Sequence, residues 1–231
     1  MNVVRNSKLV QKRVRIASAA HFAALLCFTG GLFISREEQY LWVVYATMVI
    51  GLGLYAVGQH LLKRWGPRYR FDGLLVQALK GLDKRYTLGA FLHPKLPDYV
   101  VIGPQGIVPL IAQPQTGLIT CRSDQWSKEA GRWGFIGSFF APGLKNPTLD
   151  ARRASKQVMD FMTERFGAEV MQDVPILPSI VFMNPKARLR VDGCSVPVTS
   201  AKELRTHLRK GKPAVSSQQT QAIADLWQSL L

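Results

Sequence analysis

Two long stretches without a charged side chain stand out in the first quarter of the chain. Residues 16–34 read IASAAHFAALLCFTGGLFI, and residues 40–62 read YLWVVYATMVIGLGLYAVGQHLL. Each has about the 20 apolar residues that an α-helix needs to cross a hydrocarbon core. The pattern predicts two transmembrane helices joined by the short segment SREEQ. A basic start before one apolar run is also typical of a cleaved signal peptide, but this run is long and no A-x-A site follows it.

Beyond residue 70 the apolar positions recur with shorter periods. Leu75, Leu79 and Leu82 lie at helical spacing and predict an amphipathic helix over residues 72–82. Four apolar runs then predict strands, namely YTLGAFL (86–92), YVVI (99–102), IVPLI (107–111) and LITCR (118–122). The GPQG segment between the second and third runs has the Pro and Gly of a tight reversal.

The remaining third of the chain continues this alternation. Residues 126–147 are rich in Gly and aromatic side chains and predict a long surface or site-covering loop. A helix is expected from Asn146, with Val158, Met162 and Phe166 as its buried stripe. PSIVFMNP and CSVPVT predict two strands, and two helices close the chain, the last one capped near Ser216. This order describes an α/β sandwich with a mixed sheet.

The flanks of the two apolar runs predict how the chain lies in a membrane. Basic side chains precede the first run at Arg5, Lys8, Lys12, Arg13 and Arg15, and follow the second at Lys63, Arg64, Arg68 and Arg70. Because cytoplasmic flanks are rich in Lys and Arg, both termini are expected in the cytoplasm. We therefore predict an integral membrane protein with a two-helix hairpin in residues 1–64 and a cytoplasmic domain in residues 65–231.

Charge narrows the class of partner. The chain has 30 Lys and Arg against 15 Asp and Glu, a net charge of +15. Such a balance favours nucleic acid phosphates or anionic lipid headgroups as partners, although clusters of this kind are often only a solvated surface. The sequence contains three such clusters, namely Arg152, Arg153 and Lys156, then Lys186, Arg188 and Arg190, and then Arg209, Lys210 and Lys212, and the first two are the predicted nucleic-acid-binding residues.

Cysteine and histidine give no metal-binding pattern. Cys27, Cys121 and Cys194 are far apart and fit no C-x-x-C spacing, so free thiols in a reducing compartment are expected. The four histidines form no ligand pair at helical spacing, which argues against a zinc site.

Several short segments together carry a family resemblance. They are PDYVVIGPQG (97–106), the Gly117 and Ile119 pair, Trp126, KNPTLD (145–150), IVFMNP (180–185) and VSSQQTQAIADL (215–226). In this order and spacing, about 160 residues from Asp72 onward resemble the NERD (nuclease-related domain) family. Its fold is similar to that of PD-(D/E)xK restriction-type nucleases, so the resemblance implies a restriction-endonuclease-like α/β sandwich.

The resemblance also implies where a catalytic site would lie. The family has an Asp opening a strand, a GP.G turn, and a second strand ending in Glu-x-Lys. Without a gap, Asp98 falls on the Asp, Ile111 on the Glu and Gln113 on the Lys, while Asp72 is the match for an acid in the first helix. Paired carboxylates bind Mg²⁺ in such nucleases, and the lysine orients or activates the attacking water. Ile111 can offer the ion no side-chain ligand, and Gln113 carries no positive charge and cannot exchange a proton near neutral pH.

Pro109 is a second departure from the family pattern. Since proline removes a ladder donor, the strand is expected to bulge or to lie locally unpaired there.

These features predict a membrane-anchored, nuclease-related domain without hydrolytic activity or small-molecule cofactor. It would act as a binding or scaffolding module for DNA, RNA or a protein partner. One alternative is an active nuclease with relocated catalytic residues, in which Asp72 and Asp98 hold Mg²⁺. Another is a module whose basic domain lies on anionic lipid.

Overall fold

The computed structural model describes residues 1–36, 38–67, 70–128, 145–171 and 173–230. The chain divides into two compact units. One is the helical hairpin, Ser7–Arg70, and the other, here called the α/β domain, combines Met1–Asn6 with Phe71–Leu231. Residues 1–6, assigned from the sequence to the N-terminal part, therefore belong to the α/β domain.

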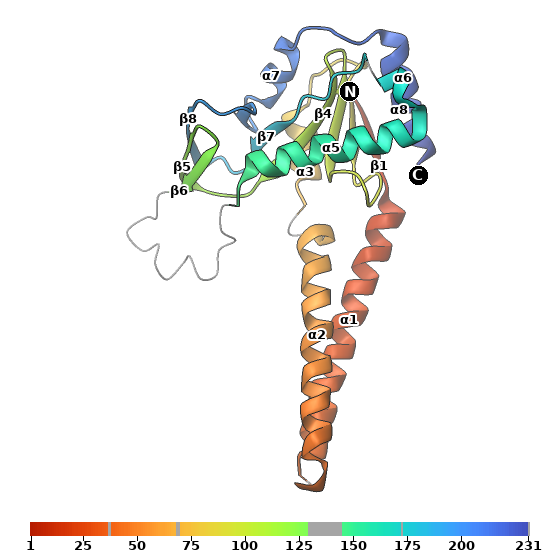
Figure 1. Cartoon of the computed structure of the whole chain (residues 1–231), viewed down its shortest axis with the longest axis vertical. Coiled ribbons are helices and arrows are strands. Elements are labelled where there is room, and N and C mark those ends of the chain that lie inside the picture. Colours follow the sequence, from red (N-terminus) through yellow and green to blue (C-terminus); the bar gives the residue numbers. More distant parts are fainter. Residues whose placement is uncertain (37, 68–69, 129–144, 172, 231) are drawn as a thin grey trace. The chain divides into compact units, whose positions relative to one another are not determined.

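The helical hairpin consists of α1 (Ser7–Ile34), a 3₁₀ turn (Glu38–Tyr40) and α2 (Leu41–Trp65), as Figure 1 shows. Both helices are long and apolar enough to cross a membrane. The helix α1 begins nine residues before the apolar run, because Lys and Arg in residues 8–15 are good helix formers and continue it toward the N-terminus.

Small residues let α1 and α2 approach closely. The buried positions recur every seventh residue, at Val10, Ala17, Ala24 and Gly31 in α1 and at Gly51, Gly58 and Trp65 in α2. A side chain added at Gly51 would meet the ring of Phe28, and one added at Gly58 would meet His21. This seven-residue repeat keeps one face of each helix toward its partner.

The α/β domain is built on a six-stranded mixed sheet of order β1-β2-β3-β4-β7-β9. Its strands are β1 (Asn2–Arg5), β2 (Thr87–Ala90), β3 (Tyr99–Gly103), β4 (Gly106–Gln113), β7 (Ser179–Phe182) and β9 (Val198–Ser200). The β2, β3 and β4 strands form an antiparallel meander, while β1, β7 and β9 each pair in parallel. The predicted mixed sheet is thus confirmed, with β1 as an additional edge strand.

Helices pack against this sheet. On one face, α5 (Pro147–Phe166) lies across the strands and α8 (Ser217–Ser229) lies beside it, so that Phe161 and Trp227 share a core with Val100 and Ile102 (Figure 1). The two short helices α3 (Asp72–Ala78) and α7 (Leu204–Lys210) bury Leu75, Leu204 and Leu208. The predicted helix over residues 72–82 ends earlier, at Ala78, and a short α6 (Ala168–Met171) follows α5.

Helix caps explain why the two long helices of the domain begin where the sequence predicts. The side chain of Asn146 accepts hydrogen bonds from the amides of Thr148 and Leu149, and Pro147 takes the first helical position. Ser216 and Gln219 form a reciprocal capping box at the start of α8.

A smaller, three-stranded sheet of order β6-β5-β8 packs near the start of α5. Its strands are β5 (Gly117–Arg122), β6 (Gln125–Lys128) and β8 (Ala187–Asp192). Ile119 is buried with Ala151 and Phe182, and the ring of Trp126 lies 6.0 Å from that of Phe182. Of the loop predicted over residues 126–147, residues 129–144 lie outside the described part of the chain.

Pro109 produces no bulge between β3 and β4, so this part of the sequence-based expectation is wrong, whereas the pairing of β4 with β7 begins only at Leu110 and leaves Pro109 unpaired on that side. The antiparallel register of β3 and β4 runs unbroken from Gly103↔Gly106 to Val100↔Pro109 and ends there. Ile107 directs both its N–H and its C=O toward residues 175–177. The nitrogen of Pro109, two residues on, points to the same side, so its missing donor costs no hydrogen bond to β3.

Candidate functional site

Asp98 and Ile111 lie just beyond the last paired residues at the open end of the β3–β4 hairpin. Asp98 directly precedes β3, and its carbonyl oxygen accepts a hydrogen bond of 2.8 Å from the amide of Phe91. The register pairs Val100 with Pro109. Continued for two more residues, it brings residue 111 opposite Asp98, where the family places its second carboxylate.

The side chain at position 111 belongs to the apolar core. Ile111 pairs with Ile180 on β7 and packs, half-buried, against the cluster that contains Ile119 and Phe182. Gln113 pairs with Phe182, and its carbonyl accepts from the amide of Met183. The hydrocarbon side chain of Ile111 offers no ligand to Mg²⁺, and Gln113 carries no positive charge where the nuclease resemblance implies a lysine, so these two positions do not fit the site that it implies.

Asp72 has a cationic partner that the sequence did not reveal. Its carboxylate lies 2.8 Å from the guanidinium of Arg5 on β1, and its side chain is only 14% exposed. The preceding residue, Phe71, donates its amide to the hydroxyl of Tyr99, which follows Asp98. Asp72 and Asp98 therefore lie at the same end of the sheet, but Arg5 competes with any metal for Asp72. From the sequence, Arg5 had been counted only among the basic flank of the first apolar run.

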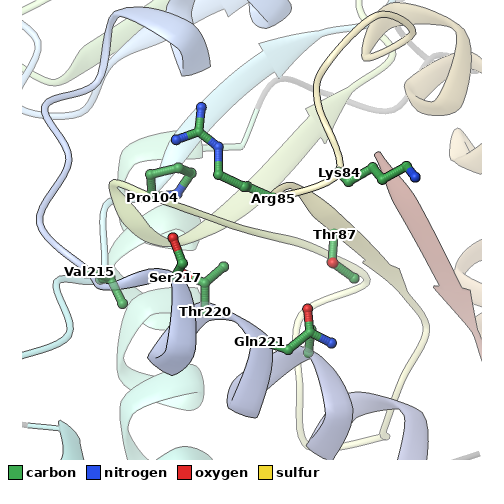
Figure 2. A pocket seen from close by; sticks show the side chains of 9 residues that line it. Lys84, Arg85, Thr87, Pro104, Val215, Ser217, Thr220 and Gln221 are labelled. Carbon is green, nitrogen blue, oxygen red and sulfur yellow. The ribbon is translucent and has the colours of Figure 1, made fainter.

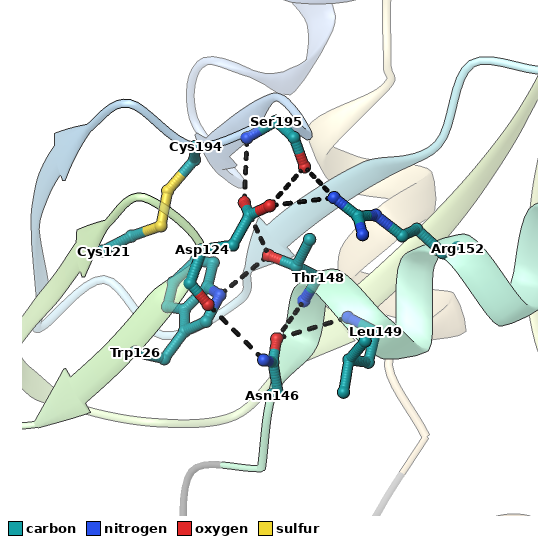
Figure 3. Close-up of a disulfide and its surroundings, with 9 residues drawn as sticks. All are labelled: Cys121, Asp124, Trp126, Asn146, Thr148, Leu149, Arg152, Cys194 and Ser195. Atoms are coloured by element: carbon teal, nitrogen blue, oxygen red, sulfur yellow. Dashed lines mark hydrogen bonds and ion pairs between the residues drawn. A yellow bond between two sulfur atoms is a disulfide. The ribbon is translucent and has the colours of Figure 1, made fainter.

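A second polar cluster surrounds Asp124, in the turn between β5 and β6. Its carboxylate accepts from the amide and hydroxyl of Ser195, at 2.9 and 2.7 Å, and from Arg152 at 2.9 Å (Figure 3). A longer bond of 3.4 Å comes from Thr148. The two bonds from Ser195, and then Arg152, hold the pKa of Asp124 below its usual range. Asp124 thus joins the small sheet to α5 and to the segment after β8.

Cys121 and Cys194 form a disulfide beside this cluster, which corrects the prediction of free thiols (Figure 3). They are 73 positions apart in the sequence, and their Cα atoms are 6.4 Å apart, within the range of natural disulfides. The pairing of β5 with β8 brings them together. Cys27, in α1, is a free thiol.

The same region holds the only group of three or more possible metal ligands among the described residues. The ligand atoms of Cys121, Asp124 and Cys194 lie within 4.8 Å of one another. However, the Asp124 carboxylate already receives four hydrogen bonds, one of them from a guanidinium. A cation would have to displace these donors, so Asp124 fits a structural anchor better than a metal ligand.

The predicted basic clusters have different environments. Arg152 is bound to Asp124 and Ser195, and Arg153 lies 3.7 Å from Asp150, while Lys156 is exposed on α5. The other cluster lies along β8. There Arg188 and Arg190 are exposed and alternate with Ala187 and Leu189, which contact the core.

Arg122 extends the second cluster. In the parallel register, Arg190 is opposite Thr120 and Asp192 is opposite Arg122, so Arg122 shares the outer face of the sheet with Arg188 and Arg190, and the one acidic residue Asp192 lies beside it on that face. We call Arg122, Lys186, Arg188 and Arg190 the basic sheet face. The sequence analysis missed Arg122 because only strand pairing places it there.

A cavity of about 200 Å³ lies between β2, the β3–β4 turn and the start of α8 (Figure 2). Thr87, Pro104 and Thr220 are among its lining residues. In Figure 2 the charged ends of Lys84 and Arg85 point away from Thr87 and Thr220, and Arg85 is bound to Asp83 at 2.6 Å. The lining is therefore mainly neutral.

Comparisons with protein-family models, with curated proteins and with solved structures gave no match.

Proposed function

We propose that the protein is a membrane-anchored, nuclease-related domain that binds nucleic acid at the cytoplasmic face of a membrane and does not hydrolyse it. The observation that carries the proposal is the register of the β3–β4 hairpin. It supports an arrangement in which Asp98 keeps the position of the first family carboxylate while Ile111 occupies that of the second.

The loss of hydrolysis follows from the chemistry of these positions. A nuclease of this kind needs two carboxylates to hold Mg²⁺ and a lysine near the attacking water. Here Ile111 contributes to the core, Gln113 carries no charge, and Asp72 is ion-paired with Arg5. One remaining carboxylate, Asp98, is too little to hold a catalytic metal.

Binding is supported by the basic sheet face. Arg188 and Arg190 are exposed, and the side chain of neither has a hydrogen-bond or ion-pair partner within the described residues. Arg122 lies on the same face by register. Arginine binds phosphate with its planar fork of donors, and such contacts are independent of base sequence. The proposal therefore concerns weak binding of DNA or RNA through the phosphate backbone.

The membrane arrangement rests on three features. The hairpin helices are long and apolar enough to span. Residues 1–6 and 71–231 form one unit, so a chain that leaves this unit through α1 must return to it through α2. The chain therefore crosses the membrane an even number of times. The basic flanks of the two helices favour the cytoplasmic side for this unit.

The test uses the full chain in nanodiscs of neutral lipid, which removes competing anionic headgroups. Fluorescence anisotropy with a labelled DNA duplex should give an affinity that falls steeply with salt, because counterion release drives such binding. The Arg188→Ala/Arg190→Ala variant should weaken binding about tenfold or more, at about 1 kcal/mol or more per phosphate contact. Lys80→Ala/Lys202→Ala makes the same charge change among exposed residues elsewhere and should have little effect.

Two results would contradict the proposal. Equal affinity of the double arginine variant and its control would show that the basic sheet face is only solvated surface. Mg²⁺- or Mn²⁺-dependent cleavage of the duplex, abolished by Asp98→Ala, would favour an active nuclease with relocated catalytic residues.

A further inference from the structure

The disulfide joins two segments that the protein also holds together by other means. The β5 and β8 strands pair over a six-residue parallel register. The amide of Ser123 donates to the carbonyl of Asp192 at 3.1 Å, and Ser195 binds Asp124 through both its amide and its hydroxyl. Since these contacts do not require the sulfur–sulfur bond, the small sheet can keep its fold when the bond is broken.

The two sulfur atoms differ in access. Cys121 lies in the middle sheet strand and is completely buried. Cys194 lies in the segment between β8 and β9 and is only half-buried. It follows Gly193, whose φ of +64° is a conformation that glycine adopts readily. An external thiol therefore reaches the sulfur of Cys194 first.

We propose that Cys121–Cys194 is a site of reversible thiol–disulfide exchange with low-molecular-weight thiols. The thiolate of one such molecule attacks the sulfur of Cys194, the Cys194–Cys121 bond breaks, and the Cys121 thiolate leaves and takes a proton from water. A second thiol molecule attacks the mixed disulfide, leaving the Cys194 thiol and a disulfide of the two small molecules. Two electrons pass to the protein, and the reverse sequence restores the bond.

The local consequence concerns Ser195. In the oxidised chain, the bond to Cys121 fixes the residue next to Ser195, so that both donors of Ser195 stay on Asp124. In the reduced chain this covalent restraint is lost, and the segment is held by non-covalent contacts such as the hydrogen bonds of Ser195 with Asp124 and Arg152. The inference rests on the proposed function in one respect, which is that the α/β domain lies in the cytoplasm. Thiol reductants are plentiful there, and disulfides are rarely permanent.

The test begins with the purified full chain in nanodiscs, equilibrated in glutathione buffers of increasing reduced-to-oxidised ratio. After acid quenching and denaturation, a maleimide–polyethylene glycol label counts the free thiols. We expect one label at Cys27 in oxidising buffer and labels on all three cysteines in reducing buffer, with full reversal on reoxidation and unchanged near-UV circular dichroism. A chain that stays oxidised in excess thiol until it is denatured, or that never forms the bond, would overturn the proposal.

Hydrogen exchange supplies a second readout. Reduction should raise the exchange rate of the Ser195 amide severalfold, and Cys194→Ser should reproduce that rate without added thiol. Cys27→Ser is the matched control and should leave the rate unchanged. Equal exchange of the Ser195 amide in both redox states would contradict the coupling.

Thiol trapping in cells separates this inference from the proposed location. A chain that exchanges reversibly when purified but is fully oxidised in unstressed cells would overturn the cytoplasmic placement and leave the exchange site supported. A chain that is mainly reduced in unstressed cells and oxidised by added diamide would support both.

Discussion

At the scale of single residues, His93 shows how the environment of one ring makes stability depend on pH. Its ring lies 4.9 Å from that of Phe161, and its Nδ1 accepts from the amide of Lys95 at 3.2 Å. Burial lowers the pKa of His93, and the charges of Arg165 and Lys95 lower it further. The folded chain therefore favours the neutral ring, whose Nδ1 can act as an acceptor.

This arrangement predicts acid sensitivity. Because the folded pKa lies below the unfolded value of about 6.5, the unfolded chain binds more protons there, and the unfolding free energy falls as the pH drops below about 6.5. His93→Gln should flatten this dependence in chemical denaturation at a series of pH values. His207→Gln should remove a separate contribution, since burial also lowers the pKa of His207. A slope that His93→Gln leaves unchanged would contradict this role.

Ile111 permits a direct test of the proposed loss of catalysis. Ile111→Glu with Gln113→Lys introduces the pair of residues that the proposed nuclease relationship expects near Asp98. Without metal, the new carboxylate would be desolvated beside Ile180 and Phe182 and would destabilise the domain. Millimolar Mg²⁺ should then raise the melting temperature, because a ligand that binds only the folded state stabilises it.

The control for that experiment is Ile111→Gln with Gln113→Lys, which has the same size and no carboxylate. It should be destabilised to a similar extent and show no response to Mg²⁺. A thermal shift of equal size in the control, or in the unmodified chain, would mean that the metal binds elsewhere.

The sequence identified some residues of the candidate site and could not identify others. Asp98, Ile111 and Gln113 were chosen by family resemblance in a local, ungapped register, and they stay a prediction, since the observed β3–β4 register covers only Val100–Gly103 and Gly106–Pro109. Asn146 and Ser216 are caps whose partners lie within three residues. The partners of Asp72 and Cys121 are distant in sequence, at Arg5 and Cys194, and only tertiary pairing reveals them.

At the scale of elements, the helical hairpin depends on its buried glycines. A Cβ at Gly58 would clash with the ring of His21 and crowd the carbonyl of Ala17 at 3.1 Å, whereas one at Gly53 would meet nothing within 4 Å. Gly58→Leu should therefore separate α1 from α2 at a cost of about 1–3 kcal/mol, and Gly53→Leu should be neutral.

Cross-linking measures this separation. The Thr47 side chain lies next to Gly31, so a Gly31→Cys/Thr47→Cys pair in a Cys27→Ser background should cross-link across the hairpin. The cross-linked fraction should fall with Gly58→Leu and stay unchanged with Gly53→Leu. Equal yields in both variants would contradict this packing.

The β1 strand determines which fragment of the chain can fold alone. Val4 is 4% exposed in the core, Arg5 pairs with Asp72, and Asn6 donates to the carbonyls of Leu92 and Leu230. A fragment of residues 71–231 should lose more than about 2 kcal/mol of unfolding free energy from Val4 alone, and it would expose the edge of β2.

Adding residues 1–6 back through a short Gly/Ser linker to Phe71 should restore the melting temperature and solubility of that fragment. The contact of Arg5 with Asp72 indicates that such a linker can reach. If the fragment without residues 1–6 melted at the same temperature, β1 would be dispensable.

Edge strands were the elements that the sequence predicted least well. The β8 sequence ARLRVD alternates apolar and basic residues, which is the two-residue period of a half-buried strand, but its arginines were assigned to a basic cluster instead. The β1 strand has only four residues and lies next to a long helix, so no periodicity could distinguish it. The central strands β2, β3, β4 and β7 are continuous apolar runs and were predicted.

At the scale of the whole molecule, the chain is organised by a domain that begins before the hairpin and continues after it. Local sequence patterns predicted the hairpin and the α/β domain, because the spacing of apolar residues and the length of each apolar run indicate the helices and strands of both. They could not predict that residues 1–6 join residues 71–231 in one unit, since that pairing crosses the entire hairpin. If both helices cross the membrane, this arrangement predicts that the α/β domain lies on one side and the segment between α1 and α2 on the other.

The consequence is testable by cysteine labelling of intact cells. Ser35 lies between α1 and α2, so it is on the opposite side of the membrane from the α/β domain if both helices cross. The basic flanks of the helices predict that this side is the outside of the cell. In a Cys27→Ser background, Ser35→Cys should react with a membrane-impermeant maleimide in intact cells, whereas Lys212→Cys, exposed in the α/β domain, should react only after permeabilisation. Labelling of Lys212→Cys but not Ser35→Cys in intact cells would place the domain outside, where an oxidising environment would make the Cys121–Cys194 bond a permanent part of the fold. Labelling of both before permeabilisation would show that the helices do not cross.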